Sequence, residues 1–101
     1  MEAPIPELQE AIRKMHGYES RYLETVAVHE KLKNETVWQG EVQVFELVGH
    51  PKVTRCYAWS FFNQDSLKRR FIAVLGDGPV TSPVRAVQAY ILAGYKSGEI
   101  K

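Results

Sequence analysis

The chain contains one cysteine and three histidines, the side chains that most often serve as nucleophiles, general bases or metal ligands. Cys56 stands between Arg55 and Tyr57, and a cationic neighbour can lower the pKa of a thiol. Neighbouring side chains of a strand point to opposite faces, so Arg55 is poorly placed to activate Cys56. We therefore interpret Cys56 as a buried, inert residue, unless the fold brings a histidine to it for Cys–His chemistry.

The three histidines have no spacing that is typical of a metal site. His16 is expected to end a helix, where it complements the helix dipole, while His29 ends a strand and His50 lies in a turn. A single cysteine also excludes an intramolecular disulfide and argues against a cysteine-based zinc site within one chain. We predict no metal and no cofactor. No catalytic residue can be assigned, so the sequence leans away from an enzyme.

A polar cleft that binds a small ligand is the first candidate site. Glu41 and Gln43 share a face of one predicted strand, and Ser60 on the following strand is placed to join them. A solvated strand face is the alternative interpretation, because spacing along the chain does not establish convergence. The predicted ligand-binding residues are Gln39, Glu41, Gln43, Cys56 and Ser60.

A basic cluster is the second candidate site, through which the protein would contact the phosphates of a nucleic acid. Its residues are Arg55, Lys68, Arg69 and Arg70. The net charge of the whole chain is only +1, and a run of charges at the start of a strand more often protects a sheet edge. Nucleic acid is therefore not the partner that the sequence favours.

A predicted antiparallel hairpin positions most of these residues. Its strands are roughly Thr36–Val48 and Lys52–Phe61, folded about the turn Gly49-His50-Pro51. If Val48 lies opposite Val53, every later cross-strand pair is fixed. The pairs are then Glu46–Arg55, Val44–Tyr57, Val42–Trp59 and Gly40–Phe61.

This register gives the hairpin two unequal faces. The larger face carries Trp38, Tyr57, Trp59 and Phe61. Burial statistics favour this aromatic face as core beneath the helices over an exposed platform for bases or a partner. The other face is plainer, but Phe45 and Leu47 keep it moderately apolar, and a second protomer would cover it. We therefore predict a homodimer formed sheet to sheet or edge to edge.

The remaining elements follow from apolar spacing and from end signals. A helix from Pro6 to His16 presents an apolar stripe and stops before Gly17. The stripe consists of Leu8, Ala11, Ile12 and Met15. Glu19–Leu32 alternates like a half-exposed strand, and a charged loop of several residues follows it. Arg69–Leu75 reads as a further strand.

Ser82-Pro83, an N-cap followed by a first-turn proline, begins the last helix. The resulting order, α-β-β-β-β-α, predicts an α+β fold. We expect a two-layer sandwich, in which a four-stranded antiparallel meander sheet carries both helices on one face. Residues 1–101 are expected to form a single domain, with residues 1–5 and 96–101 loosely held.

Three functional hypotheses remain open. The first is a non-catalytic binding or interaction module that homodimerises through its sheet. The second is a small-molecule-binding protein, or a small enzyme, with a cleft on the sheet. The third is a nucleic-acid binder that uses Lys68–Arg70. The acidic N-terminus and the lack of a long apolar run predict a soluble, cytoplasmic protein without a membrane partner.

Overall fold

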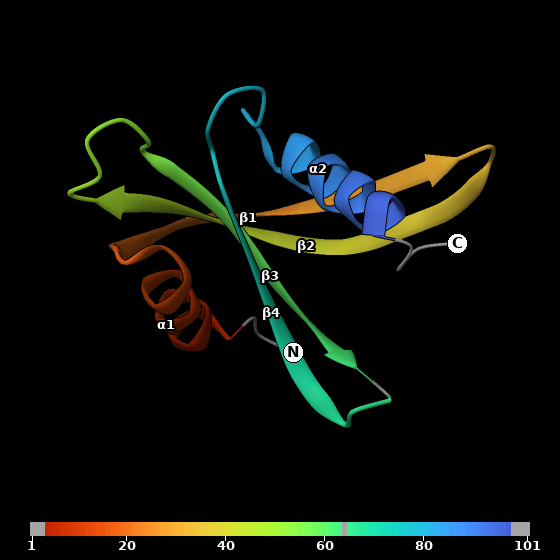
Figure 1. Cartoon of the computed structure of the whole chain (residues 1–101), viewed down its shortest axis with the longest axis horizontal. Helices are drawn as coiled ribbons and strands as arrows, with labels where there is room; N and C mark the ends of the chain where they lie inside the picture. The colour runs from red at the N-terminus through yellow and green to blue at the C-terminus, as the bar shows by residue number, and fades with distance from the viewer. Residues whose placement is uncertain (1–3, 64, 98–101) are drawn as a thin grey trace.

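The structure, a computed structural model, describes residues 4–63 and 65–97, which form two helices and one four-stranded sheet (Figure 1). The elements in chain order are α1 (Ile5–His16), β1 (Glu19–Leu32), β2 (Glu35–Val48), β3 (Arg55–Asn63), β4 (Lys68–Leu75) and α2 (Pro83–Ser97). Neighbouring strands are antiparallel and follow one another in the order β1-β2-β3-β4, so the sheet is an open meander. The predicted α+β class and element order are confirmed.

The helix α1 buries one apolar stripe and ends at a glycine. Leu8 and Ile12 are buried, whereas Met15, predicted to lie on the same stripe, is half exposed. Gly17 adopts φ +81°, in the left-handed region that favours glycine, and donates its N–H to the carbonyl oxygen of Arg13 at 2.8 Å. The predicted end of this helix is therefore confirmed.

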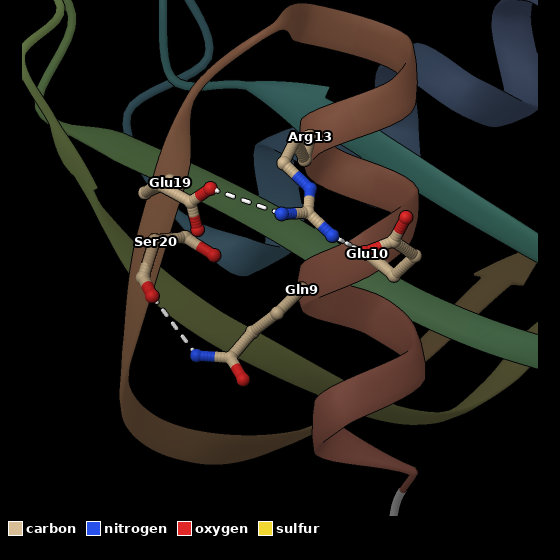
Figure 2. Close-up of polar contacts among 5 residues, drawn as sticks. All are labelled: Gln9, Glu10, Arg13, Glu19 and Ser20. Carbon is tan, nitrogen blue, oxygen red and sulfur yellow. Dashed lines mark hydrogen bonds and ion pairs between the residues drawn. The ribbon is translucent and has the colours of Figure 1, made fainter.

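Polar contacts join α1 to the first residues of β1 (Figure 2). Gln9 Nε2 donates a hydrogen bond to the carbonyl oxygen of Ser20 at 2.9 Å. Arg13 contacts Glu19 at 3.3 Å and also pairs with Glu10, one turn earlier on the helix. Because these charged side chains are exposed, each ion pair contributes only about 0–1 kcal/mol, and their main effect is on the orientation of the helix.

The turn between β1 and β2 is tighter than the predicted loop of several residues. It contains only Lys33 and Asn34, with φ of 52° and 68°, as in the two-residue turns whose twist matches a hairpin. Two bulges interrupt the pairing of this long hairpin, one at Leu23 in β1 and one at Val37 in β2.

The register between β2 and β3 is the predicted one wherever the two strands pair. Glu46 lies opposite Arg55, and Val44 lies opposite Tyr57. An ion pair joins Arg55 Nη1 to Glu46 Oε2 at 3.7 Å. The side of the sheet that each of these residues takes is therefore also as predicted.

The pairing between β2 and β3 is short, and the sheet forks beyond it. Only four pairs form, and the last is Gln43 with Ala58. From there β2 continues beside β1 and β3 beside β4, so that the two hairpins diverge (Figure 1). The twist of each hairpin accumulates toward its tip, which separates the two middle strands. Two predicted pairs are therefore wrong: Val42–Trp59 and Gly40–Phe61.

The two helices cover opposite faces of the sheet, which corrects the prediction that both lie on one face. Val44 packs in a cluster with Val87 of α2, while its neighbour Phe45 packs in a cluster with Ile12 of α1. The α2 cluster also contains Val28, Val42, Tyr57, Trp59, Ala86 and Ile91. The α1 cluster also contains Leu8, Leu47, Val53, Cys56 and Ala58. The predicted burial of the aromatic face is thus confirmed for Tyr57 and Trp59, but beneath α2 alone.

The helix α2 begins as predicted. Pro83 is its first residue, and Ser82 Oγ accepts a hydrogen bond from the N–H of Arg85 at 3.2 Å.

In the part of the chain that the structure describes, no helix is long and apolar enough to cross a membrane. Most of the chain ends predicted to be loosely held, residues 1–3 and 98–101, lie outside the described residues.

Candidate functional site

The divergence of the two hairpins leaves a groove, called the fork groove from here on. Its volume is about 390 Å³. Residues 37–41 of β2 form one side and residues 59–61 of β3 form the other, while Tyr90 and Ile91 of α2 complete the lining. The groove therefore combines side chains from three elements that are far apart in the sequence.

Three aromatic rings form one wall of the fork groove. The ring of Trp59 meets that of Trp38 at a centroid distance of 5.4 Å and an interplanar angle of 72°. It meets the ring of Tyr90 at 5.5 Å and 86°. Both arrangements are edge-to-face, the geometry that aromatic quadrupoles prefer. The wall is therefore a packed, preformed surface.

Trp59 also brings an unused hydrogen-bond donor to this wall. Its side chain is only 2% exposed, and within residues 4–63 and 65–97 its Nε1 has no hydrogen-bond partner. A buried N–H without an acceptor costs about 1–3 kcal/mol, so most such groups in proteins are paired. The nitrogen atom itself is closed off from solvent, so an acceptor in the groove could reach it only if the indole of Trp59 turned.

Gly40 allows the wall to form. A Cβ atom at this position would stand 3.2 Å from Cη2 of Trp38, which is closer than nine in ten contacts of this kind, so the indole would have to shift by a few tenths of an ångström. The indole of Trp38 therefore lies over the bare backbone of Gly40. Gly40 is a site of close packing and not a bulge, since the bulge of β2 lies at Val37.

The polar side of the fork groove contains Gln39, Glu41 and Ser60. Arg69 on β4 donates a hydrogen bond from Nη1 to Ser60 Oγ at 2.9 Å. Glu41 is exposed and forms no ion pair with any described residue. The groove thus offers a carboxylate, an amide and a hydroxyl beside its aromatic wall.

The backbone of β2 faces the fork groove as well. Leu47 donates its N–H to the carbonyl oxygen of Thr54, so the backbone groups of Leu47 point toward β3. Backbone direction alternates along a strand, and therefore Gln39 and Glu41 point their N–H and C=O groups the same way. The β2–β3 ladder has already ended at Gln43, so within the described residues β1 pairs with one side of this stretch and no strand pairs with the side that faces the groove.

The fold brings together three of the five predicted ligand-binding residues and separates the other two. Gln43 and Cys56 share their face of the sheet with the other three residues, but they lie where β2 and β3 still pair and are buried, at 2% and 0% exposure. Gln43 Oε1 accepts a hydrogen bond from the hydroxyl of Thr25 on β1. Binding by Gln39, Glu41 and Ser60 stays a prediction, whereas Gln43 and Cys56 do not line the groove.

Cys56 lies in an apolar environment. Burial raises the pKa of its thiol from 9.0 to about 12, so the thiol is protonated at neutral pH. None of the three histidine rings hydrogen-bonds to it in the part of the chain that the structure describes. Within the same residues, no group of three or more His, Cys, Asp or Glu side chains could hold a metal ion.

The residues of the predicted nucleic-acid site do not converge. Arg55 begins β3 and is paired with Glu46, while Lys68 begins β4 and lies opposite Asn63 at the other end of β3. At about 3.3 Å per residue, the length of β3 places Arg55 and Lys68 roughly 25 Å apart. The four basic residues therefore form no single patch.

Two other grooves lie elsewhere on the molecule. One, of about 500 Å³, lies between α1 and β4 and has Met15 and Phe71 in its lining. The other, of about 560 Å³, lies between α2 and the tip of the β1–β2 hairpin and includes Leu32 and Leu92. Neither is lined by a buried polar side chain that lacks a partner among the described residues. The fork groove is therefore the strongest candidate site.

The sequence placed Trp38, Trp59 and Phe61 on one aromatic face, for which core was favoured over a binding platform, and it did not indicate Tyr90. Trp59 was expected to be core, and it is, but one edge of the same residue also lines the groove. Tyr90 lies on a helix whose position depends on tertiary packing, so no spacing in the sequence could relate it to β3. Gly40, two residues after Trp38, was a further signal, because a glycine there allows a close approach of ring and backbone.

In comparisons with known proteins, no family model, no curated protein and no solved structure matches this chain.

Proposed function

We propose that this protein is a non-catalytic binding module and that the fork groove is its ligand site. The observation that carries the proposal is one groove in which a packed aromatic wall is combined with the polar side chains of Gln39, Glu41 and Ser60. Binding sites are typically apolar concavities with a few polar groups that fix orientation. The ligand would have an apolar or aromatic body that packs against the wall, with polar groups toward Gln39, Glu41 and Ser60.

The two tryptophans of the chain provide a direct test, because both line the groove. A library of small aromatic and amide fragments is screened by two-dimensional NMR on the ¹⁵N-labelled protein. We expect the bound fragments to shift the indole N–H signal of Trp59. Variant Gly40→Ala, which displaces the indole of Trp38, should weaken these fragments, whereas Phe62→Ala outside the groove should not.

Two results would count against the proposal. One is a screen in which no fragment moves either indole signal. The other is a set of fragments that shift only residues of the α1–β4 groove or of the α2 groove. Either result would remove the fork groove as the ligand site.

A homodimer is a second proposal, which the open outer edges of the sheet favour. The face that a second protomer was expected to cover carries Phe45 and Leu47, and α1 already packs on both. Support for dimerisation therefore moves from the sheet face to the edges β1 and β4, which have no further strand beside them among the described residues. Size-exclusion chromatography with light scattering down to low micromolar concentration should give a dimer. A monomer at all concentrations would contradict this second proposal, and a cytoplasmic location stays a prediction.

A further inference from the structure

We propose that the ligand of the fork groove is an extended peptide segment that adds as a strand to the inner edge of β2. This inference rests on the proposed function, and it names the chemistry of the ligand. Three observations carry it: the free backbone groups of β2, the alternation of side chains along that edge, and the charge of Glu41.

The backbone groups of Gln39 and Glu41 are the first observation. Each presents one N–H donor and one C=O acceptor toward the groove, with the spacing of a strand edge. Another extended main chain is the partner whose donors and acceptors repeat at the same spacing, which is the basis of recognition by strand addition. A small molecule would use only one or two of these groups.

The protection of the two outer edges makes the inner edge distinctive. β1 is interrupted by the bulge at Leu23, and β4 begins with the basic run Lys68–Arg70. A bulge and a run of like charges make these edges poorer templates for an unrelated peptide than an edge that has neither. Between Gln39 and Gln43, β2 has no bulge and no proline. The inner edge is therefore the better template for a peptide.

The side chains along the edge predict the sequence pattern of the peptide. Residues paired across two strands share a face, so peptide residues opposite Trp38 and Gly40 would meet the aromatic wall. Residues on the other face would lie beside Gln39 and Glu41. Because Glu41 has no ion-pair partner among the described residues, a basic side chain suits the position opposite it. The peptide thus alternates apolar residues with polar ones, including a basic residue.

The test begins with a phage-displayed library of random short peptides selected on the intact protein. The enriched peptide is synthesised, and its affinity is measured through tryptophan fluorescence. We expect alternating apolar and polar residues, with a basic residue among the polar ones. Variant Glu41→Gln should weaken binding of this peptide by about three- to tenfold.

Variants at Gln39 separate backbone pairing from side-chain contact. Proline at this position removes an N–H that points into the groove and takes no part in pairing with β1. Alanine removes the side chain and keeps the N–H. We expect Gln39→Ala, which loses one side-chain contact, to weaken binding of the peptide by about threefold, and Gln39→Pro to bind it at least about tenfold more weakly than Gln39→Ala.

N-methylation of the peptide keeps the inference testable if Gln39→Pro does not fold. Two methylated forms of the peptide are compared, one with methyl groups on its odd-numbered backbone nitrogens and one with them on its even-numbered nitrogens. One form should lose binding and the other should keep it, because only every second N–H faces β2. Equal binding of the two methylated peptides, or equal affinity of the proline and alanine variants for the peptide, would overturn strand addition. Neither result would contradict the proposal that the fork groove is a ligand site. Failure of the library to enrich any peptide would also overturn it, while the fragment screen judges the groove independently.

Discussion

The middle of the sheet and its fork contain the same two strands but have opposite surroundings. In the middle, β2 and β3 pair from Gln43–Ala58 to Glu46–Arg55, and this four-pair segment is called the joint here. Both faces of the joint are covered, one by α1 and the other by α2. A few residues farther along, the same strands separate, and their backbone edges line a groove. Stability is therefore concentrated in the joint, while the binding capacity lies in the fork.

The contrast shows that each of the two strands is buried along one part of its length and exposed along another. Phe45 in the joint is fully buried, whereas Phe62 near the far end of β3 is 54% exposed. Cys56 and Ala58 are small and completely buried, which lets α1 approach the joint closely. In the fork, the bare backbone of Gly40 instead supports the ring of Trp38. The following predictions probe this division, from the largest expected effect to the smallest.

Truncation of Phe45 in the joint and of Phe62 in the fork compares the two regions directly. Phe45→Ala leaves a cavity between the sheet and α1, and we expect it to lower the free energy of unfolding by about 3–5 kcal/mol. Phe62→Ala is the matched control and should change it by no more than about 0.5 kcal/mol. Urea unfolding followed by circular dichroism measures both. Similar losses for the two variants would mean that the joint is not the main source of stability.

The thiol of Cys56 makes the joint sensitive to alkaline pH. Burial raises its pKa from 9.0 to about 12, so the unfolded chain loses this proton first as pH rises. The stabilising contribution is complete below pH 9 and is lost as pH rises through about 12. In urea titrations, the natural protein should therefore lose stability more steeply over this range than Cys56→Ala. The variant retains Tyr57, whose pKa burial also raises. Parallel curves for the two proteins would contradict a buried thiol.

His50 stabilises the connection between β2 and β3 through local hydrogen bonds. Its Nδ1 accepts hydrogen bonds from the N–H groups of Lys52 at 3.1 Å and Val53 at 2.9 Å. His50→Ala removes this acceptor and should lower the free energy of unfolding by about 1–2 kcal/mol. His50→Asn, whose side-chain oxygen accepts similar local bonds, should lose less. If alanine and asparagine prove equally destabilising, the ring contact of His50 with Tyr18 at 4.7 Å matters more than the acceptor.

The tip of the β1–β2 hairpin should respond least, because it is far from the joint. Lys33 adopts φ 52°, a conformation that costs lysine more than asparagine. We expect Lys33→Asn to raise the free energy of unfolding by about 0.5 kcal/mol. Lys31→Asn, in the strand just before the turn, serves as the control and should bring no gain. A thermal melt that cannot distinguish the two variants would refute the strain at Lys33.

The joint could be predicted from the sequence because its signals are local. The turn residues and the alternation of apolar side chains set the register, and Glu46 does lie opposite Arg55. Helix ends were equally local, as the left-handed Gly17 shows. The misplacement of α1 had a physical origin. Cys56 and Ala58 look like a weak, plain face in the sequence, but small side chains are what a closely packed helix requires.

The fork could not be predicted, because alternation along two strands does not show where their pairing ends. The extrapolated pair of Val42 with Trp59 followed the correct register into a region where twist had already separated the strands. The polar residues Gln39, Glu41 and Ser60 were found because they share the plainer face. The face of Trp38 and Trp59 was interpreted as core rather than as a binding surface, and Tyr90 was missed because its contact with Trp59 exists only in the folded molecule.

The most direct test of this account is amide hydrogen exchange, measured by NMR on the free protein. The fork leaves the N–H groups of Gln39 and Glu41 without a strand partner, whereas those of Gly40 and Val42 face β1. We predict fast exchange at Gln39 and Glu41 and strong protection at Gly40 and Val42. Equal protection at all four amides would show that β2 and β3 remain paired past the joint, and it would contradict the fork.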